Sequence, residues 1–249
     1  MTPAQVFKIA FNMTAWFETS GQIYTCASGN FDGQGCSWGP RQDCIGQGSL
    51  QPLMRKMLET DPEAMATALG PLLASFKAVA APQPTSKQLA TVVADWNTPE
   101  GKLKPEWSSA FAALGKLDFV QTIFQGDATG SIAAVNDLAL WIAAGKPVTV
   151  RHWCLAFDFV TQNGGFNTHL KLACNAFLLF LAPFQKDVRD RMRALVWLRS
   201  GWVYVLGNRA FAADVLARKL LIVEGVGTVH GAVIHADQQF GISDDMVTP

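Results

Sequence analysis

The sequence has little charge and no surplus of either sign. Charged residues make up 16% of its 249 residues, and 20 lysines and arginines balance 20 aspartates and glutamates. A neutral chain lacks the basic surplus of a nucleic-acid-binding protein and has no long-range attraction to anionic lipid. Because hydrophobic residues reach 49%, we expect helices that face protein more than water, around a sizeable core. We therefore predict no nucleic-acid partner.

The sequence also lacks segments that would carry the chain across a membrane. Its apolar start, from Pro3 to Phe17, has no positive region before it and no small-residue cleavage site. We therefore expect it to belong to the fold, in a protein made in the cytoplasm without a signal peptide. The most apolar later stretch, Leu170 to Phe184, contains Lys171 and is too short to cross a hydrocarbon core of about 30 Å. We expect a buried helix there and no membrane insertion.

Standard metal-binding patterns are missing as well. Three of the five cysteines, Cys26, Cys36 and Cys44, fall in one short segment whose spacing fits no zinc site. His230 and His235 lie five apart without a third ligand. We predict no metal and no cofactor. The cysteines are expected to be small buried thiols, with a disulfide between Cys26 and Cys36, or between Cys36 and Cys44, as the alternative.

Helical patterns fill most of the chain. Thr2-Pro3-Ala4-Gln5 combines a capping threonine, a proline at the first helical position and a glutamine three residues after the cap, which predicts a helix to about Glu18. Its apolar residues point in nearly every direction, as in a central helix. Further helices are predicted after Ser49, from Asp61 to about Ala80, and over residues 86–96, 105–125, 130–145, 149–162, 167–181, 184–205 and 208–223.

Residues 21–48 differ from the rest because they are rich in glycine and polar side chains. The β-favouring Ile23-Tyr24-Thr25 precede a turn-like Ser28-Gly29-Asn30, which predicts a short hairpin or sheet. We therefore predict an α+β fold, mainly α, as one domain over residues 1–249. A small β-containing lobe would cover about residues 19–48, and helices would form the remainder.

Two carboxylates in contrasting surroundings stand out within this region. Glu18 is the one acidic residue among the first 31 and follows Trp16 and Phe17, so we expect partial desolvation to favour its protonated form. Asp32 follows in a polar loop, where we expect a solvated, ionised carboxylate. Such a pair suits glycosidic hydrolysis, with one group donating a proton and the other activating water or attacking the sugar. In the structural alternative, Glu18 merely ends a helix and Asp32 is a turn residue.

The order of residues here resembles a known catalytic segment. Residues 17–20 read FETS and residues 24–39 read YTCASGNFDGQGCSWG. They are similar to the segment of family-46 chitosanases in which a Phe-Glu pair ends the first helix and an Asp-Gly-x-Gly loop follows. The resemblance implies a lysozyme-like fold of two lobes around a cleft, with the β segment of residues 23–38 forming one wall.

The same resemblance implies roles for three residues. Glu18 would be the general acid, Asp32 the base that positions the attacking water, and Ser37 the second group that holds this water. The mechanism would be single displacement with inversion. For that route we predict a separation of roughly 6.5–9.5 Å between the two carboxyl groups, whereas about 5 Å would indicate a covalent intermediate.

The sequence departs from the chitosanase pattern in the substrate-binding part. Chitosanases carry a further Asp that binds the cationic sugar, but Gly46-Gln47-Gly48-Ser49 offers no acid there. Gln42 instead resembles the cleft glutamine of lytic transglycosylases and goose-type lysozymes. We expect Gln42, Asn30, Gln34 and Trp38 to hydrogen-bond to and stack on N-acetylated sugars.

A second candidate region lies far along the chain. AFDFVTQNGG, residues 156–165, looks like the distal helix that closes the cleft in these enzymes and in related phage-type cell-wall hydrolases. The predicted substrate contacts are Gln162, Asn163 and Asp158. For Asp158 a second reading stays open, that of a buried helix acid bonded to backbone.

These observations favour a muramidase that cleaves peptidoglycan glycan strands. The alternatives are a chitosanase, a lytic transglycosylase and a non-catalytic cell-wall-binding module. Without a secretion signal, we expect an antibacterial secretion effector or a phage endolysin that acts in the periplasm or cell wall of a target bacterium. An effector would imply an immunity protein as a further partner.

Overall fold

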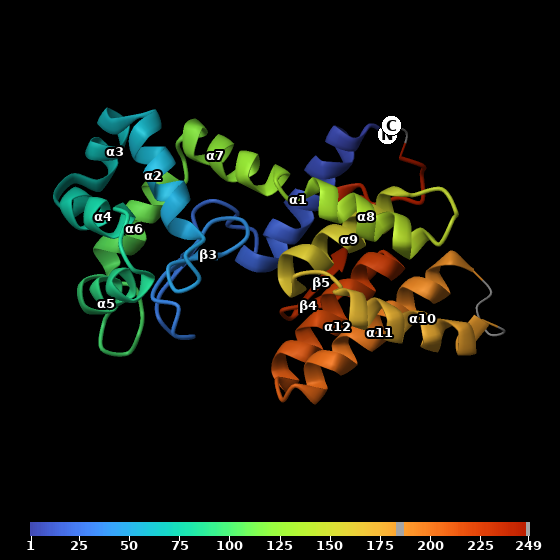
Figure 1. Ribbon diagram of the computed structural model, residues 1–249. Helices are drawn as coiled ribbons and strands as arrows, with labels where there is room; N and C mark the ends of the chain where they lie inside the picture. Colours follow the sequence, from blue (N-terminus) through green and yellow to red (C-terminus); the bar gives the residue numbers. More distant parts are fainter. Residues whose placement is uncertain (183–186, 248–249) are drawn as a thin grey trace. The chain divides into compact units, whose positions relative to one another are not determined.

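The chain divides into two compact units. The computed structural model describes residues 1–182 and 187–247. Unit 1 combines Met1–Phe17 with Ser131–Pro249, and unit 2 is the continuous segment Glu18–Gly130 (Figure 1). The first helix, α1 (Pro3–Thr19), starts in unit 1 and ends in unit 2. Glu18 is therefore the first residue of unit 2.

Unit 2 holds a small antiparallel sheet and six α-helices. The sheet has the order β1-β2-β3, with Ala27 opposite Trp38 and Ser37 opposite Cys44. Its strands are β1 (Ala27–Ser28), β2 (Ser37–Trp38) and β3 (Asp43–Cys44). The helices are α2 (Leu50–Thr60), α3 (Pro62–Leu69), α4 (Leu73–Ala80), α5 (Thr85–Asp95), α6 (Pro105–Leu114) and α7 (Asp118–Thr129).

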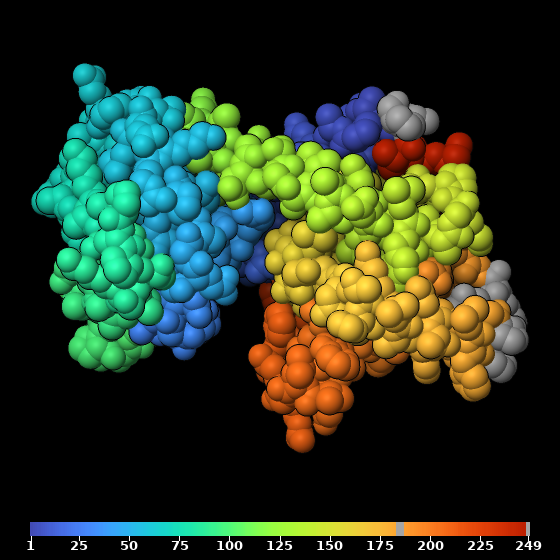
Figure 2. Space-filling view, viewed as in Figure 1, coloured from blue at the N-terminus to red at the C-terminus, as the bar shows by residue number. Residues whose placement is uncertain are grey.

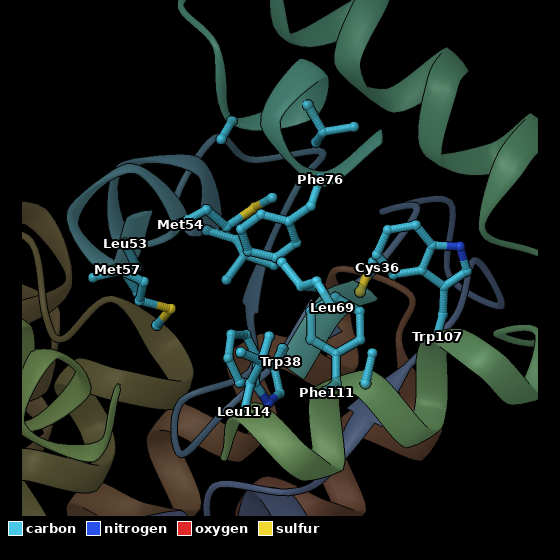
Figure 3. Packing of buried hydrophobic residues seen from close by; sticks show 14 of the residues in the cluster. Cys36, Trp38, Leu53, Met54, Met57, Leu69, Phe76, Trp107, Phe111 and Leu114 are labelled. Carbon is cyan, nitrogen blue, oxygen red and sulfur yellow. The ribbon is translucent and has the colours of Figure 1, made fainter. Parts of the chain in front are cut away.

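Aromatic side chains fill the core of unit 2 (Figure 3). The ring of Trp38 lies 4.9 Å from that of Phe111 and 5.0 Å from that of Phe124, centre to centre. Trp96 and Trp107 stack at 4.0 Å. Because each buried aromatic removes a large apolar area from water, this cluster stabilises the unit. Trp38 of β2 thus packs the β segment against α6 and α7.

Unit 1 is built mainly of helices, with one hairpin. Its helices after α1 are α8 (Ile132–Ala143), α9 (Val150–Asn163), α10 (Thr168–Leu181), α11 (Val188–Val205), α12 (Arg209–Glu224) and α13 (Ala236–Phe240). Strands β4 (Val226–Val229) and β5 (Ala232–His235) pair antiparallel after α12. Helices α11 and α12 pack side by side, as do α8 and α9 (Figure 1).

The predicted fold class is confirmed, since the chain is mainly helical with a small antiparallel sheet. The start of α1 also agrees with its sequence signature. Thr2 Oγ1 accepts the backbone N–H of Gln5 at 3.4 Å, and Gln5 Oε1 accepts that of Thr2 at 2.9 Å. These two bonds satisfy N–H groups that a helix start leaves open.

Several predicted boundaries differ from the structure. The helix expected from Asp61 to Ala80 breaks at a short 3-10 turn, Gly70–Leu72. The one expected over residues 105–125 is two helices, since α6 ends at Leu114 and α7 begins at Asp118. Between them the chain passes so close to Tyr24 that a β-carbon on Gly115 would lie 2.1 Å from the Tyr24 carbonyl oxygen. The β4–β5 hairpin was not predicted. Residues 19–48 do not form a lobe alone, since they share a core with α2–α7.

The expectation of a buried helix at Leu170–Phe184 is wrong for its described part. Within α10 only Cys174 and Leu178 are buried, whereas Leu179 is 76% and Phe180 73% exposed. An apolar pattern identifies a hydrophobic helix but does not say whether another element covers it. Residues 183 and 184 lie outside the described residues, and in the described ranges no helix has the length and hydropathy to cross a membrane.

All five cysteines are free thiols, so neither of the two alternative disulfides is present. Cys36, Cys44, Cys154 and Cys174 are buried, as predicted, whereas Cys26 is half-buried. Burial raises the pKa of the Cys36 thiol far above its usual range, with a further contribution from Cys44. Thiols in such surroundings are poor nucleophiles and serve as small packing groups.

Candidate active site

Glu18 lies in the last turn of α1. Its neighbours Phe17 and Thr19 are 1% and 4% exposed, while Glu18 itself is half-buried. The helix then ends at Ser20 and Gly21, both with positive φ angles, 50° and 89°. This placement puts a half-buried carboxyl group at the C-terminal end of α1, directly before the glycine-rich segment.

Asp32 lies in an exposed loop whose shape depends on side-chain to backbone hydrogen bonds. Asp32 Oδ1 accepts the backbone N–H of Gln34 at 3.0 Å, and Asn30 Oδ1 accepts that of Gly35 at 2.8 Å. Gly33 and Gly35 have φ angles of 82° and 78°, in the left-handed region that favours glycine. The loop thus presents the Asp32 carboxylate to solvent.

Asn97, between α5 and α6, fixes this loop to the helical part of unit 2. Its Oδ1 accepts the backbone N–H of Asn30 at 3.0 Å, and its Nδ2 donates to the carbonyls of Gly35 and Val92, each at 3.0 Å. The residue is 4% exposed. The sequence does not identify Asn97 as important. An asparagine after a helix is common in turns, and nothing near it in the chain shows that its side chain bonds to a distant loop.

Replacing Asn97 by alanine should lower the free energy of unfolding by about 2–3 kcal/mol, since buried backbone groups would lose their partners. We also expect faster amide exchange over residues 30–36, measured by hydrogen–deuterium exchange mass spectrometry. Asn97→Asp is the matched variant: it keeps the acceptor toward Asn30 but sets a buried carboxylate oxygen against the two carbonyls, so its effect should be at least as large as that of alanine. Unchanged exchange in both variants would contradict a clamping role.

The remaining predicted residues of unit 2 fall into two groups. Asn30, Gln34 and Gln42 are half-buried in or beside the loop, and Gln42 Oε1 accepts the Ser28 hydroxyl at 3.2 Å. Ser37 is 6% exposed in β2. The contacts of the three amide side chains with substrate, and that of Ser37 with the attacking water, stay predictions.

The assignment of Trp38 to sugar stacking is corrected by the structure. Trp38 is 0% exposed, and its Nε1 donates to the Tyr24 carbonyl at 2.8 Å. It lies among core residues in Figure 3. A ring enclosed by protein on both faces cannot stack on a sugar. Its hydrophobic area contributes instead to the packing of the β segment.

A further acid, Asp43 in β3, was not considered in the sequence analysis. It is 7% exposed and lies 3.4 Å from Arg41, which also pairs with Asp127. Burial raises the pKa of Asp43, although Arg41 partly offsets this effect. Asp43 Oδ2 is buried without a hydrogen-bond partner among the described residues. The arrangement fastens β3 to α7 rather than offering a carboxylate to solvent.

In unit 1, Asp158 is a buried ion-pair centre. It is 0% exposed, and its Oδ1 accepts Arg218 Nη2 at 2.6 Å while Oδ2 accepts Lys219 Nζ at 2.8 Å. Burial alone would raise the pKa of Asp158, but the two cations outweigh it and lower the pKa to about 2. Its predicted role as a substrate contact is therefore corrected. The buried reading is right, although the partners are side chains rather than backbone.

Gln162 and Asp214 extend this network toward the surface. Lys219 Nζ also donates to Gln162 Oε1, and Gln162 Nε2 donates to Asp214 Oδ2 at 2.6 Å. Asp214 Oδ1 lies 2.9 Å from Nε2 of His230, which is 44% exposed in side-chain area. Gln162 is thus a structural member of the network. In the described part of the chain, no group of three or more His, Cys, Asp or Glu side chains could hold a metal ion.

Asn163, the last residue of α9, is half-buried. Its side-chain oxygen and nitrogen are both buried, with no hydrogen-bond partner among the described residues. Its carbonyl accepts Arg199 Nη2 at 2.7 Å. A substrate contact of Asn163 stays a prediction.

The buried network also holds α1. Thr14 Oγ1 donates to Asp158 Oδ1 at 3.1 Å, and the Arg218 guanidinium lies 5.0 Å from the centre of the Phe17 ring. Trp16 packs edge-on against Phe17 at 6.1 Å. The last residues of α1 before Glu18 are therefore fixed by α9 and α12.

These helices and the small sheet have the arrangement of a lysozyme-like helical fold. A GH46 chitosanase from Gynuella sunshinyii, solved in complex with chitotetraose, superposes on the chain with a TM-score of 0.56. The match covers 93% of this chain and 97% of that one, at 14% sequence identity. At that identity the likeness shows the fold. No family model matches the sequence, and no curated protein matches it by sequence.

Proposed function

We propose that the chain is a glycoside hydrolase acting on a polysaccharide, with Glu18 as its general acid and Asp32 as its general base. The observation that carries the proposal is the contrast between these two carboxyl groups of unit 2. Glu18 is half-buried at the end of a largely apolar helix, and Asp32 lies in an exposed, glycine-shaped loop. A lysozyme-like fold shared with a GH46 chitosanase supports the proposal.

The proposed reaction is a single displacement. Glu18 gives its proton to the glycosidic oxygen as the bond from that oxygen to the anomeric carbon breaks. Asp32 accepts a proton from a water molecule whose oxygen attacks the anomeric carbon from the opposite face. One water is consumed, and the sugar configuration is inverted. The Ser37 hydroxyl would hold this water together with Asp32.

We propose peptidoglycan as the substrate, cleaved between its N-acetylated sugars. The segment Gly46–Ser49 carries no acid that could bind a cationic amino sugar. Amide side chains around the loop, those of Asn30, Gln34 and Gln42, can exchange hydrogen bonds with N-acetyl groups. A target in the cell wall would place the enzyme in the periplasm, as a secretion effector or a phage endolysin. An immunity protein would accompany an effector.

Chitosan hydrolysis is the second candidate, because the solved neighbour is a chitosanase. Unit 2 contains 11 acidic and eight basic residues, a small negative balance that would attract a polycation. These acidic residues are spread over the unit, whereas a subsite specific for chitosan needs an acid next to the bound amine.

The two candidates differ in substrate and product. The purified protein should be incubated separately with sacculi and with soluble chitosan, and the products identified by mass spectrometry. We expect muropeptides with reducing ends from sacculi, at a rate well above the release of reducing ends from chitosan. Nuclear magnetic resonance of the first products should show inverted anomers.

Other outcomes would assign a different activity. Faster release from chitosan would favour the second candidate, and anhydro-sugar ends would identify a transglycosylase. Binding to sacculi without any product would indicate a non-catalytic module and would contradict the proposal.

A further inference from the structure

Helix α10 has an unusually apolar exposed face. Leu172, Leu179 and Phe180 are 62%, 76% and 73% exposed. Together with Ala176 they follow the i, i+4, i+7, i+8 spacing of one helix face. The helix lies at the edge of unit 1 beside α11 (Figure 1), and its residues form part of the outer surface in Figure 2. A face of this kind is normally covered in a soluble protein.

Helix α11 continues the apolar surface. Trp197, Trp202 and Val205 are 57%, 50% and 78% exposed, and they line a groove with Phe177 and Leu181 of α10. Tyr204, in the last turn of α11, and Leu206, the residue after the helix, are 51% and 70% exposed. We call this combined surface the α10–α11 patch. It is defined by Leu172, Phe177, Leu179, Phe180, Trp197, Trp202, Tyr204, Val205 and Leu206.

The charge around the patch is positive, although the whole chain is neutral. Residues 159–182 and 194–213, which hold the patch residues, contain three lysines and arginines, Lys171, Arg199 and Arg209, and no aspartate or glutamate. Lys171 lies over the Trp141 ring at 5.7 Å, and Arg209 over the Tyr204 ring at 5.3 Å. Within residues 1–182 and 187–247, neither of these two cations forms an ion pair.

We propose that the α10–α11 patch binds the surface of an anionic phospholipid bilayer. Tryptophan and tyrosine prefer the interface between lipid and water, and exposed leucine and phenylalanine side chains gain by entering the acyl boundary. Lys171 and Arg209 would pair with phosphate headgroups. The helices would lie along the membrane rather than cross it, which agrees with their length and hydropathy.

Charge complementarity selects lipid over a second copy of the chain. In a two-fold dimer the same patch would face itself, so its basic rims would meet and repel each other. An anionic bilayer offers the opposite charge and a continuous apolar phase. The inference is independent of the proposed hydrolase activity, because it concerns unit 1 residues outside the candidate active site.

Vesicle flotation tests the inference. The full chain should float with vesicles of phosphatidylglycerol and phosphatidylcholine, and at least tenfold less with phosphatidylcholine alone. The double variant Leu179→Ser/Phe180→Ser should reduce flotation at least tenfold. Arg209→Glu should reduce binding to the anionic vesicles, with a smaller effect at high salt, where charges are screened. Val233→Ser, on the 69% exposed Val233 of β5, is the matched control and should bind like the wild type.

Failure of the wild type to float with anionic vesicles would overturn the inference. A dimer seen by light scattering and lost in the double variant would then assign the patch to a second copy. Equal binding by the double variant and the wild type would also overturn it, because the lipid site would lie elsewhere. Sacculus hydrolysis, measured on the same samples, reports separately on the proposed function.

Discussion

Replacing Glu18 by glutamine should lower the rate of sacculus hydrolysis by at least a thousandfold. The amide has nearly the same shape as the carboxyl group, but it cannot donate a proton to the glycosidic oxygen. The loss should appear in kcat rather than in substrate affinity, since proton donation matters in the transition state. Release of soluble muropeptides, followed by chromatography over several hours, measures it.

Variants at other carboxyl groups test the assignment. Asp32→Asn should lower the rate about a hundredfold to a thousandfold, because the water would lose its base. Glu59→Gln, at an exposed position of α2, is the matched control and should keep full activity. If Glu18→Gln retained more than a tenth of the wild-type rate while remaining folded, Glu18 could not be the acid.

Asp158→Asn should lower the free energy of unfolding by about 3–5 kcal/mol. The substitution removes the carboxylate that pairs with both buried cations, Arg218 and Lys219, and losing the charged partner of a buried cation is costly. Urea denaturation followed by circular dichroism measures the change. Asp137→Asn, on the exposed side of α8, serves as the control and should change stability by less than about 0.5 kcal/mol.

Two further measurements separate charge from packing at Asp158. The double variant Asp158→Asn/Lys219→Met should recover about 1–2 kcal/mol, since it also removes one of the two cations that Asp158 pairs with. In the wild type, the folded-state pKa of about 2 lies below the usual 3.8. The stability that ionised Asp158 gives the folded state is therefore present above about pH 4 and lost as the pH falls toward 2. Asp158→Asn should lack this component of the acid unfolding curve.

Local signals in the sequence predicted much of the helical framework. The Thr2 and Gln5 pair marks the start of α1, and Asp61, whose side chain accepts the Ala64 N–H at 2.9 Å, marks the start of α3. Such caps act within one helical turn, so neighbouring residues contain the necessary information. The order of a first helix, a small β segment and many later helices is predictable for the same reason.

Long-range contacts account for most of what sequence reasoning missed. Asp158 is paired by residues 60 and 61 positions later, and Asn97 bonds to a loop 67 residues earlier. Trp38 has the flanking residues of a loop aromatic, yet α6 and α7 enclose it. In each case the deciding neighbour comes from another element. The sequence predicted that Glu18 ends the first helix and that Asp32 lies in a polar loop. It did not predict the distant residues that fix this helix and this loop.

The path of the chain also affects the order in which the protein can be completed during synthesis. Unit 2 is one continuous stretch, so it can assemble while later residues are still being added. The residues of α1 before Glu18 have to wait, because Asp158 and Arg218, which contact Thr14 and Phe17, are made more than 140 residues after them. A truncated translation product would therefore carry Glu18 on an unsupported helix.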